Sequence, residues 1–234
     1  MSAVASTALA EDWEARTSPK AIVELFTSQG CSSCVAADKF FAELAERPDV
    51  VALSFHVDYW DYLGWRDTLS DPAHTERQRG YAAVHGSRRV YTPQMVINGT
   101  DDFVGSDRGA VDKAIAQSTL AVPVTMRRGD GTVEIEVAGR SVPHQWPATI
   151  RLVLLTSEAE VAIGRGENAG TTMDYYNVVR AMRPVGMWDG EAVKITLPEH
   201  ELMGHGVDAC AIIVQEDKPN GPGAIIGAAW LGGW

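Results

Sequence analysis

The sequence predicts an α/β domain followed by an all-β, sandwich-like domain, and two patterns support this fold class. Between residues 21 and 118, short apolar runs alternate with segments whose apolar residues recur every three or four positions, which is typical of strands alternating with helices. From residue 120 onward the apolar period is two, and Gly, Pro and Asn separate the short runs, as in a β-sandwich. We therefore expect a tail over residues 1–19, the α/β domain over 20–119 and the β domain over 120–234.

The first half begins with a strand, a sharp turn and a helix. The apolar run at 22–26 predicts the strand, and helical spacing of apolar residues predicts a helix over 35–47. A second run at 50–57 is mostly apolar, so we expect a strand that is buried on both faces and pairs in parallel with the first. Pro72 behind a capping residue predicts a helix that ends near His85.

A hairpin and a helix close the first half. The apolar run at 94–97 is followed by the Asn98-Gly99 dipeptide, which favours a tight turn, and then by a returning strand at 103–104. The last helix ends near Ser118.

The second half contains strands only. The Gly-Asp-Gly sequence at 129–131 predicts a hairpin, and turn residues separate the other runs. The expected strands are 122–128, 132–138, 149–157, 159–164, 175–182, 192–197, 209–215 and 224–230.

Charge and hydropathy exclude two classes of partner. The 234 residues carry a net charge of -11 with scattered basic residues, so a nucleic acid or an anionic membrane surface finds no basic patch. No apolar run approaches the roughly 18 residues that suggest a membrane-spanning helix. We therefore expect neither nucleic-acid binding nor membrane insertion.

Two cysteines lie three positions apart where the first strand gives way to a helix. The unpaired N–H groups and the positive end of the macrodipole at a helix start favour a thiolate over a thiol. We expect Cys31 to be an exposed, acidified nucleophile and Cys34 a shielded resolving thiol. The alternatives are a structural pair or half of a metal site, although the chain has no second Cys-x-x-Cys.

The number of cysteines and the N-terminal residues are the two sequence features that could indicate the cellular compartment of the protein. Cys210 lies in an almost continuous apolar run and is predicted to be a small buried hydrophobe. Three cysteines are not a disulfide framework, so their number leaves the compartment open. Residues 1–10 end in the small-x-small pattern that precedes a signal-peptidase site, which favours the remnant of an export signal; a tail of small residues is the alternative.

Further candidates follow the strand at 50–57. In open α/β sheets, ligands collect at the carboxyl ends of strands. His56 or Asp58 is therefore a candidate proton acceptor for the cysteines, and the alternative is that both fix a loop by hydrogen bonds. Trp60 is a candidate for an aromatic wall that contacts a peptide, and packing onto the sheet is the alternative.

The motif set resembles two known groups. The order of strand, Cys-x-x-Cys helix, parallel strand, helix, Thr-Pro, hairpin and helix resembles the thioredoxin fold over residues 21–118. Over the whole chain, the sequence is similar to the DUF1223 family of exported bacterial thioredoxin-like proteins. The matching motifs are Glu-Leu-Phe-Thr at 24–27, Gly-Cys-Ser-Ser-Cys at 30–34, His-Val-Asp-Tyr-Trp at 56–60, Tyr-Thr-Pro-Gln at 91–94, Gly-Arg-Gly-Glu-Asn at 164–168 and Asn-Val-Val-Arg at 177–180.

The resemblance implies a cis Thr92–Pro93 bond beside the cysteines and a periplasmic or secreted location. The chain departs from these relatives at Val35, where they commonly have proline, and at Leu25, where thioredoxin has a buried aspartate that relays protons. Proton transfer to Cys34 therefore needs another group, or water.

We arrive at the hypothesis of a thiol:disulfide oxidoreductase, or a redox-sensing relative, that acts on protein or peptide thiols and disulfides without a cofactor. A copper-binding protein that uses both thiolates, or a non-catalytic interaction module, is the alternative. The catalytic set is Cys31, Cys34 and Pro93, and the supporting or substrate-binding set is Thr92, Ser32, Ser33, His56, Asp58 and Trp60.

Overall fold

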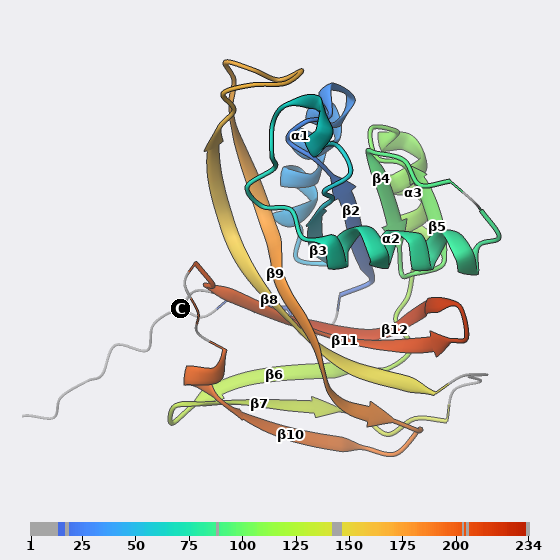
Figure 1. The fold of residues 1–234 in the computed structure, drawn as a ribbon. Coiled ribbons are helices and arrows are strands. Elements are labelled where there is room, and N and C mark those ends of the chain that lie inside the picture. Colours follow the sequence, from blue (N-terminus) through green and yellow to red (C-terminus); the bar gives the residue numbers. More distant parts are fainter. Residues whose placement is uncertain are drawn as a thin grey trace, which may run out of the picture.

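The computed structural model describes residues 14–16, 19–87, 89–141, 147–202, 204 and 206–232. Within these residues the strands form a nine-stranded sheet and a three-stranded sheet (Figure 1). No helix in this part of the chain is long and apolar enough to cross a membrane.

The first half contains the expected alternation of strands and helices. β2 and β3 pair in parallel, and β4 and β5 form an antiparallel hairpin, as predicted. The Asp71 carboxylate accepts a hydrogen bond from the N–H of Ala73 and, with Pro72 in the first turn, sets the start of α2. The elements are β2 (Ala21–Thr27), the 3₁₀ helix η1 (Ser32–Cys34), α1 (Val35–Ala45), β3 (Val50–His56), η2 (Asp61–Leu63), α2 (Pro72–Val84), β4 (Gln94–Ile97), β5 (Asp101–Val104) and α3 (Arg108–Gln117).

In the second half, β8, β9, β11 and β12 are longer than the strands expected there. The two strands predicted at 149–157 and 159–164 are one continuous strand, β8, which ends at Ala162. Positive φ angles at Asp130 and Gly131 form the tight β6–β7 turn, as the sequence predicts. The elements are β6 (Val124–Gly129), β7 (Thr132–Val137), β8 (Ala148–Ala162), β9 (Thr172–Trp188), β10 (Val193–Pro198), η3 (Glu199–Glu201), β11 (Ala209–Lys218) and β12 (Gly221–Gly232).

The predicted fold class, a thioredoxin-like α/β domain followed by an all-β sandwich-like domain, is wrong. β3 pairs in parallel with β9 at Ser54 and Val178, which joins both halves of the chain in one mixed sheet with the order β1-β12-β11-β8-β9-β3-β2-β4-β5. Figure 1 shows β8 and β9 running from the three-stranded sheet up to the start of α1. The pairing was missed because its partners lie far apart in the sequence. The domain boundary near residue 119 stays a prediction.

Three apolar cores explain why β2, β3 and most of β11 are buried on both faces. Alternate residues of β11 enter different cores: Ala211 and Ile213 contact the core shared with β2 and β3, whereas Ile212 and Val214 contact the core beneath the three-stranded sheet. The packing of β6, β7 and β10 against the large sheet is the sandwich-like part of the fold. α1 and α3 cover the third core, on the other face of β2.

The N-terminal prediction falls mainly on residues 1–13, which lie outside the described residues. Residues Glu14–Arg16 form the short edge strand β1, which pairs with β12 and which the sequence analysis missed. The Arg16 guanidinium donates to the carbonyl of Val50 and stacks over Trp230 at 4.8 Å.

Candidate functional site

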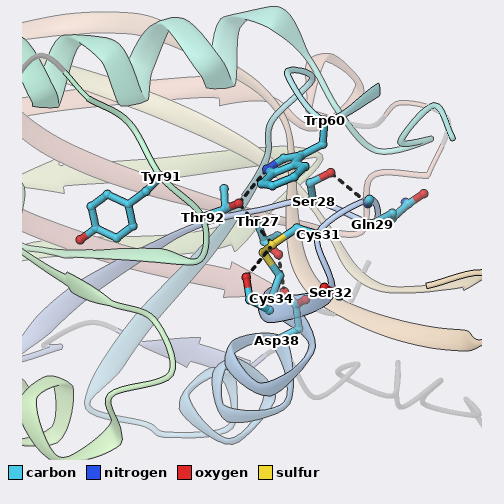
Figure 2. Close-up of a disulfide and its surroundings, with 12 residues drawn as sticks. Thr27, Ser28, Gln29, Cys31, Ser32, Cys34, Asp38, Trp60, Tyr91 and Thr92 are labelled. Atoms are coloured by element: carbon cyan, nitrogen blue, oxygen red, sulfur yellow. Dashed lines mark hydrogen bonds between the residues drawn. A yellow bond between two sulfur atoms is a disulfide. The ribbon is translucent and has the colours of Figure 1, made fainter. Parts of the chain in front are cut away.

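Cys31 and Cys34 are joined by a disulfide at the turn between β2 and α1 (Figure 2). Their Cα atoms are 5.4 Å apart, and the N–H of Cys34 donates to the carbonyl of Cys31. Cys34 already has helical backbone angles, so both sulfurs lie at the helix start, as predicted.

Cys31 is buried, and the expectation of an exposed sulfur is wrong. Cys31 is 1% exposed and Cys34 is 0% exposed. Trp60 covers the turn: its Cβ lies 3.2 Å from the position that a Cβ on Gly30 would occupy, so only glycine fits at position 30 without a shift. The burial results from contacts between distant segments, which local spacing does not report.

Thr92 and Ser33 place hydroxyl groups on the sulfur of Cys31. The Thr92 Oγ1 donates to Cys31 Sγ at 3.3 Å, and the Ser33 hydroxyl lies at 3.3 Å from the same sulfur. Trp60 Nε1 donates to Thr92 Oγ1 at 2.8 Å and so orients that hydroxyl (Figure 2). The Thr92–Pro93 bond is cis, as expected, and the structure brings Thr92, Ser33 and Trp60 to the disulfide.

The loop between β8 and β9 also covers the turn that holds Cys31. The β8–β9 loop, residues 163–171, reaches the cysteine turn, where Glu167 accepts hydrogen bonds from the N–H (3.1 Å) and the hydroxyl (2.7 Å) of Ser32. These bonds lower the pKa of Glu167. Asn168 Nδ2 donates to the carbonyls of Gln29 and Cys31 at 2.9 and 3.2 Å. The sequence resemblance singled out this segment, but nothing in the sequence placed it against the cysteines.

A buried carboxyl group lies on the same helix as Cys34. Asp38 follows Cys34 by one helical turn, is 6% exposed and accepts a hydrogen bond from Thr27 Oγ1 at 2.8 Å (Figure 2). Its second oxygen, Oδ2, is buried without a partner. Burial raises the pKa of Asp38 to about 7, while the neighbouring His56 opposes this shift.

His56 pairs with an aspartate that the sequence analysis did not select. Its Nδ1 lies 2.8 Å from Asp67 Oδ2, and both side chains are fully buried. Burial favours a raised pKa for Asp67, but His56 and the backbone N–H groups of Gln29 and Leu69 outweigh it and lower that pKa. His56 Nε2 is buried without a partner, and the ring packs edge-on against Tyr175 at 4.6 Å between ring centroids.

Asp58 has a different contact. The Thr75 hydroxyl of α2 donates to Asp58 Oδ1 at 2.6 Å, which ties the loop after β3 to α2. This geometry matches the alternative role of fixing a loop. Asp67 lies in the long β3–α2 connection, where no sequence pattern distinguishes it from other polar loop residues.

The structure also shows where Cys210 lies and whether a cluster of metal ligands is present among the described residues. Cys210 is buried in the core beneath the three-stranded sheet, and burial raises the pKa of its thiol to about 12, as suits a small apolar residue. Across the described residues, no three His, Cys, Asp or Glu side chains converge as a metal site.

Comparisons with known proteins give a family and two similar structures. The family model described as "Protein of unknown function (DUF1223)" matches residues 22–215. The crystal structure of protein AGR_C_4864 from Agrobacterium tumefaciens is 37% identical with a TM-score of 0.82, and the match covers 93% of this chain and 96% of that one. HBP35 of Porphyromonas gingivalis is 12% identical with a TM-score of 0.63 over 92% of this chain and 75% of that one, which shows a similar fold only. No curated protein matches.

Proposed function

We propose that this chain, which belongs to the DUF1223 family of proteins of unknown function, catalyses thiol–disulfide exchange through Cys31 and Cys34. The observation that carries the proposal is a short-range disulfide at a helix start with two hydroxyl groups on one of its sulfurs. A disulfide stabilises a fold more as the loop it closes lengthens, and this one joins residues only three apart. Its position therefore suits chemistry better than crosslinking.

The proposed thiol–disulfide exchange proceeds in two steps. In the dithiol form, the Cys31 thiolate attacks a substrate disulfide, forms a mixed disulfide and releases one substrate thiolate. The Cys34 thiolate then attacks Cys31 Sγ, which restores the Cys31–Cys34 disulfide and releases the second substrate thiolate. Two electrons pass from the protein to the substrate, and the reverse sequence oxidises a substrate dithiol.

Two features favour the thiolate of Cys31. The Thr92 and Ser33 hydroxyls that contact its sulfur would donate to a thiolate, and such charge-assisted bonds are stronger than neutral ones. The helix start contributes its positive dipole end. Glu167 places an opposing charge beside Ser32, so removing this carboxylate should lower the pKa of the Cys31 thiol.

Asp38 is the proton acceptor for Cys34 in this proposal. Cys34 must lose its proton before it attacks the mixed disulfide, and the unpartnered oxygen of Asp38 lies one helical turn away on the buried side of α1. A carboxyl group with a pKa of about 7 exchanges protons near neutral pH. His56, Asp67 and Tyr175 are the other titratable groups around Asp38, and Thr27 donates to its paired oxygen.

A substrate reaches Cys31 only when part of its cover moves. Trp60 and the β8–β9 loop belong to separate segments, and the loop is held at the turn by the Glu167 and Asn168 side chains. A peptide or protein thiol is the substrate class we propose, and a periplasmic or secreted location, where disulfides persist, is its proposed setting.

Reduction of a disulfide-linked peptide by the reduced protein, with glutathione as the regenerating thiol, tests the proposal. Catalysis should disappear in Cys31→Ser, and Cys34→Ser should stop at a mixed disulfide that mass spectrometry detects. Cys210→Ala is the matched control, because that thiol is buried away from solvent, and it should keep full activity. Equal rates with wild type, Cys31→Ser and buffer would refute the function.

A further inference from the structure

A cavity of about 440 Å³ lies between the two halves of the molecule, and the proposed exchange reaction does not use it. α2 forms one wall, and β8, β9 and the β11–β12 hairpin form the others; Figure 1 shows α2 lying next to that hairpin. Phe55, Met182 and Pro222 provide an apolar lining. The volume falls in the range of about 300–1,000 Å³ that is usual for small-molecule sites.

The charge of this cavity is opposite to that of the protein. The chain carries a net charge of -11, yet four basic side chains line the cavity: Arg77, Arg151, Arg180 and Lys218. Its two carboxylates are already engaged. Asp71 caps α2, and Asp217 accepts hydrogen bonds from Thr149 and Arg151.

Several donors at the cavity retain capacity for an anion. Within the described residues, Arg180 has neither a carboxylate partner nor a hydrogen bond, and its positive charge helps to lower the pKa of His74. Arg151 Nε is buried without a partner. Arg77 uses Nε and Nη2 to bind Glu24, Tyr81 and Gln215, which leaves Nη1 out of that network.

His74 lines the cavity and is hydrogen-bonded to the backbone of His56 in the interior. Its Nδ1 donates to the carbonyl of His56 at 2.9 Å, so in the neutral ring Nε2 carries the lone pair. Burial lowers the pKa of His74, and the positive charge of Arg180 adds to this effect, whereas Asp71 opposes it. An anion bound beside Arg180 and His74 would offset the positive charge of Arg180 and favour the protonated ring.

We propose that this cavity binds a small amphiphilic anion, a carboxylate or phosphate group on a short apolar body. The anion would contact Arg180, with the spare donors of Arg77 and Arg151 alongside, and the apolar body would lie against Phe55, Met182 and Pro222. Guanidinium groups suit both anions because their planar donor geometry matches carboxylate and phosphate oxygens.

Isothermal titration calorimetry with hexanoate, hexyl phosphate, hexan-1-ol and inorganic phosphate tests the proposal. At least one hexyl anion should bind with 1:1 stoichiometry, at least tenfold more tightly than hexanol and than inorganic phosphate. The stronger of the two hexyl anions identifies the preferred headgroup. Arg180→Gln should weaken the binding at least tenfold, because this exposed side chain has no other partner to lose.

Arg127→Gln is the matched control, since Arg127 is also an exposed strand arginine but lies on β6, outside the cavity. It should leave the affinity unchanged. Hexanol binding as tightly as the anions, an equal effect of both arginine variants, or no saturable binding of either hexyl anion would overturn the proposal. Repeating the titration with Cys31→Ser separates this site from the redox function, because binding should persist when exchange is lost.

Discussion

Glu24 and Asp38 are both buried carboxyl residues of the first half, but their surroundings differ. Glu24 is 0% exposed, lies 2.8 Å from Arg77 Nε and accepts the hydroxyl of Tyr81. Arg77 also binds Gln215 of β11, so the cluster links β2, α2 and the second half. Removing either partner of such a buried pair leaves an uncompensated charge, which gives the Glu24–Arg77 pair a structural role.

Among the described residues, no Lys, Arg or His forms an ion pair with Asp38; its one hydrogen-bond partner there is Thr27. One oxygen accepts from Thr27 and the other has no partner, and burial raises the pKa of the carboxyl to about 7. The comparison teaches that burial alone does not assign a role to a carboxylate. Glu24 is paired with a cation and has a structural role, whereas Asp38 has an unpartnered oxygen and a raised pKa near a disulfide and is a candidate for chemistry.

The largest expected effect comes from disrupting the buried Glu24–Arg77 ion pair. Glu24→Gln leaves the Arg77 charge buried without its carboxylate, and we expect the free energy of unfolding to fall by about 3–5 kcal/mol. Urea unfolding measures this loss. The rate of disulfide exchange per folded molecule should stay at the wild-type value, and a loss below about 1 kcal/mol would contradict a supporting role for this pair.

Asp38→Asn should act in the opposite direction on stability. The folded pKa of about 7 exceeds the ordinary aspartate value of 3.8, so the contribution of Asp38 to stability is present below pH 4 and is lost as the pH rises to 7. Asparagine remains neutral, and the variant should gain up to about 4 kcal/mol relative to wild type between pH 4 and 7, at about 1.4 kcal/mol per pKa unit.

Urea unfolding of the oxidised protein at several pH values measures this difference. The same variant should slow resolution of the mixed disulfide below pH 8. A stability difference that does not change with pH would contradict a raised pKa for Asp38.

Thr92→Val removes the hydroxyl on Cys31 Sγ and should raise the pKa of the Cys31 thiol. A hydrogen bond to a charged group contributes about 1.5–3 kcal/mol, which corresponds to a shift of roughly one to two pKa units. The pH dependence of alkylation in the reduced protein measures the shift. Thr100→Val, at a hydroxyl of the β4–β5 turn, is the control and should leave the alkylation profile unchanged.

Glu167→Gln should have the smallest effect, because the carboxylate is exposed and screened by salt. Alkylation of Cys31 should accelerate by roughly twofold at low ionic strength and by less at 1 M salt. Slower alkylation of Cys31 in this variant than in the wild type at low salt would contradict the proposal that the negative charge of Glu167 disfavours the Cys31 thiolate.

Local features of this fold were readable from the sequence, and long-range ones were not. The Cys-x-x-Cys turn at the start of α1 and the Asn98-Gly99 turn depend on neighbouring residues, and both are present. The pairing of β3 with β9 depends on residues over 120 positions apart, at Ser54 and Val178, and no local pattern encodes such a register.

The candidate site divides in the same way. The sequence offered Asp58 or His56 as a proton acceptor because both lie at the carboxyl end of a strand. In the structure Asp58 binds Thr75, and Asp67, from the connection that follows, lies against the His56 ring. Asp38 had a usable signal, since a charged residue four positions after Cys34 falls on the apolar face of its helix. Glu167 and Asn168 reach the cysteine turn only through the long β8–β9 hairpin, whose position depends on long-range strand pairing.

The central claim is that the Cys31–Cys34 pair is redox-active in the folded protein. Equilibration in glutathione buffers of graded potential, with the dithiol fraction determined by alkylation and mass spectrometry and the fold followed by circular dichroism, tests it most directly. We predict a reversible two-electron transition that leaves the fold intact. A disulfide that is reduced only when the protein unfolds would contradict the claim and identify a structural crosslink.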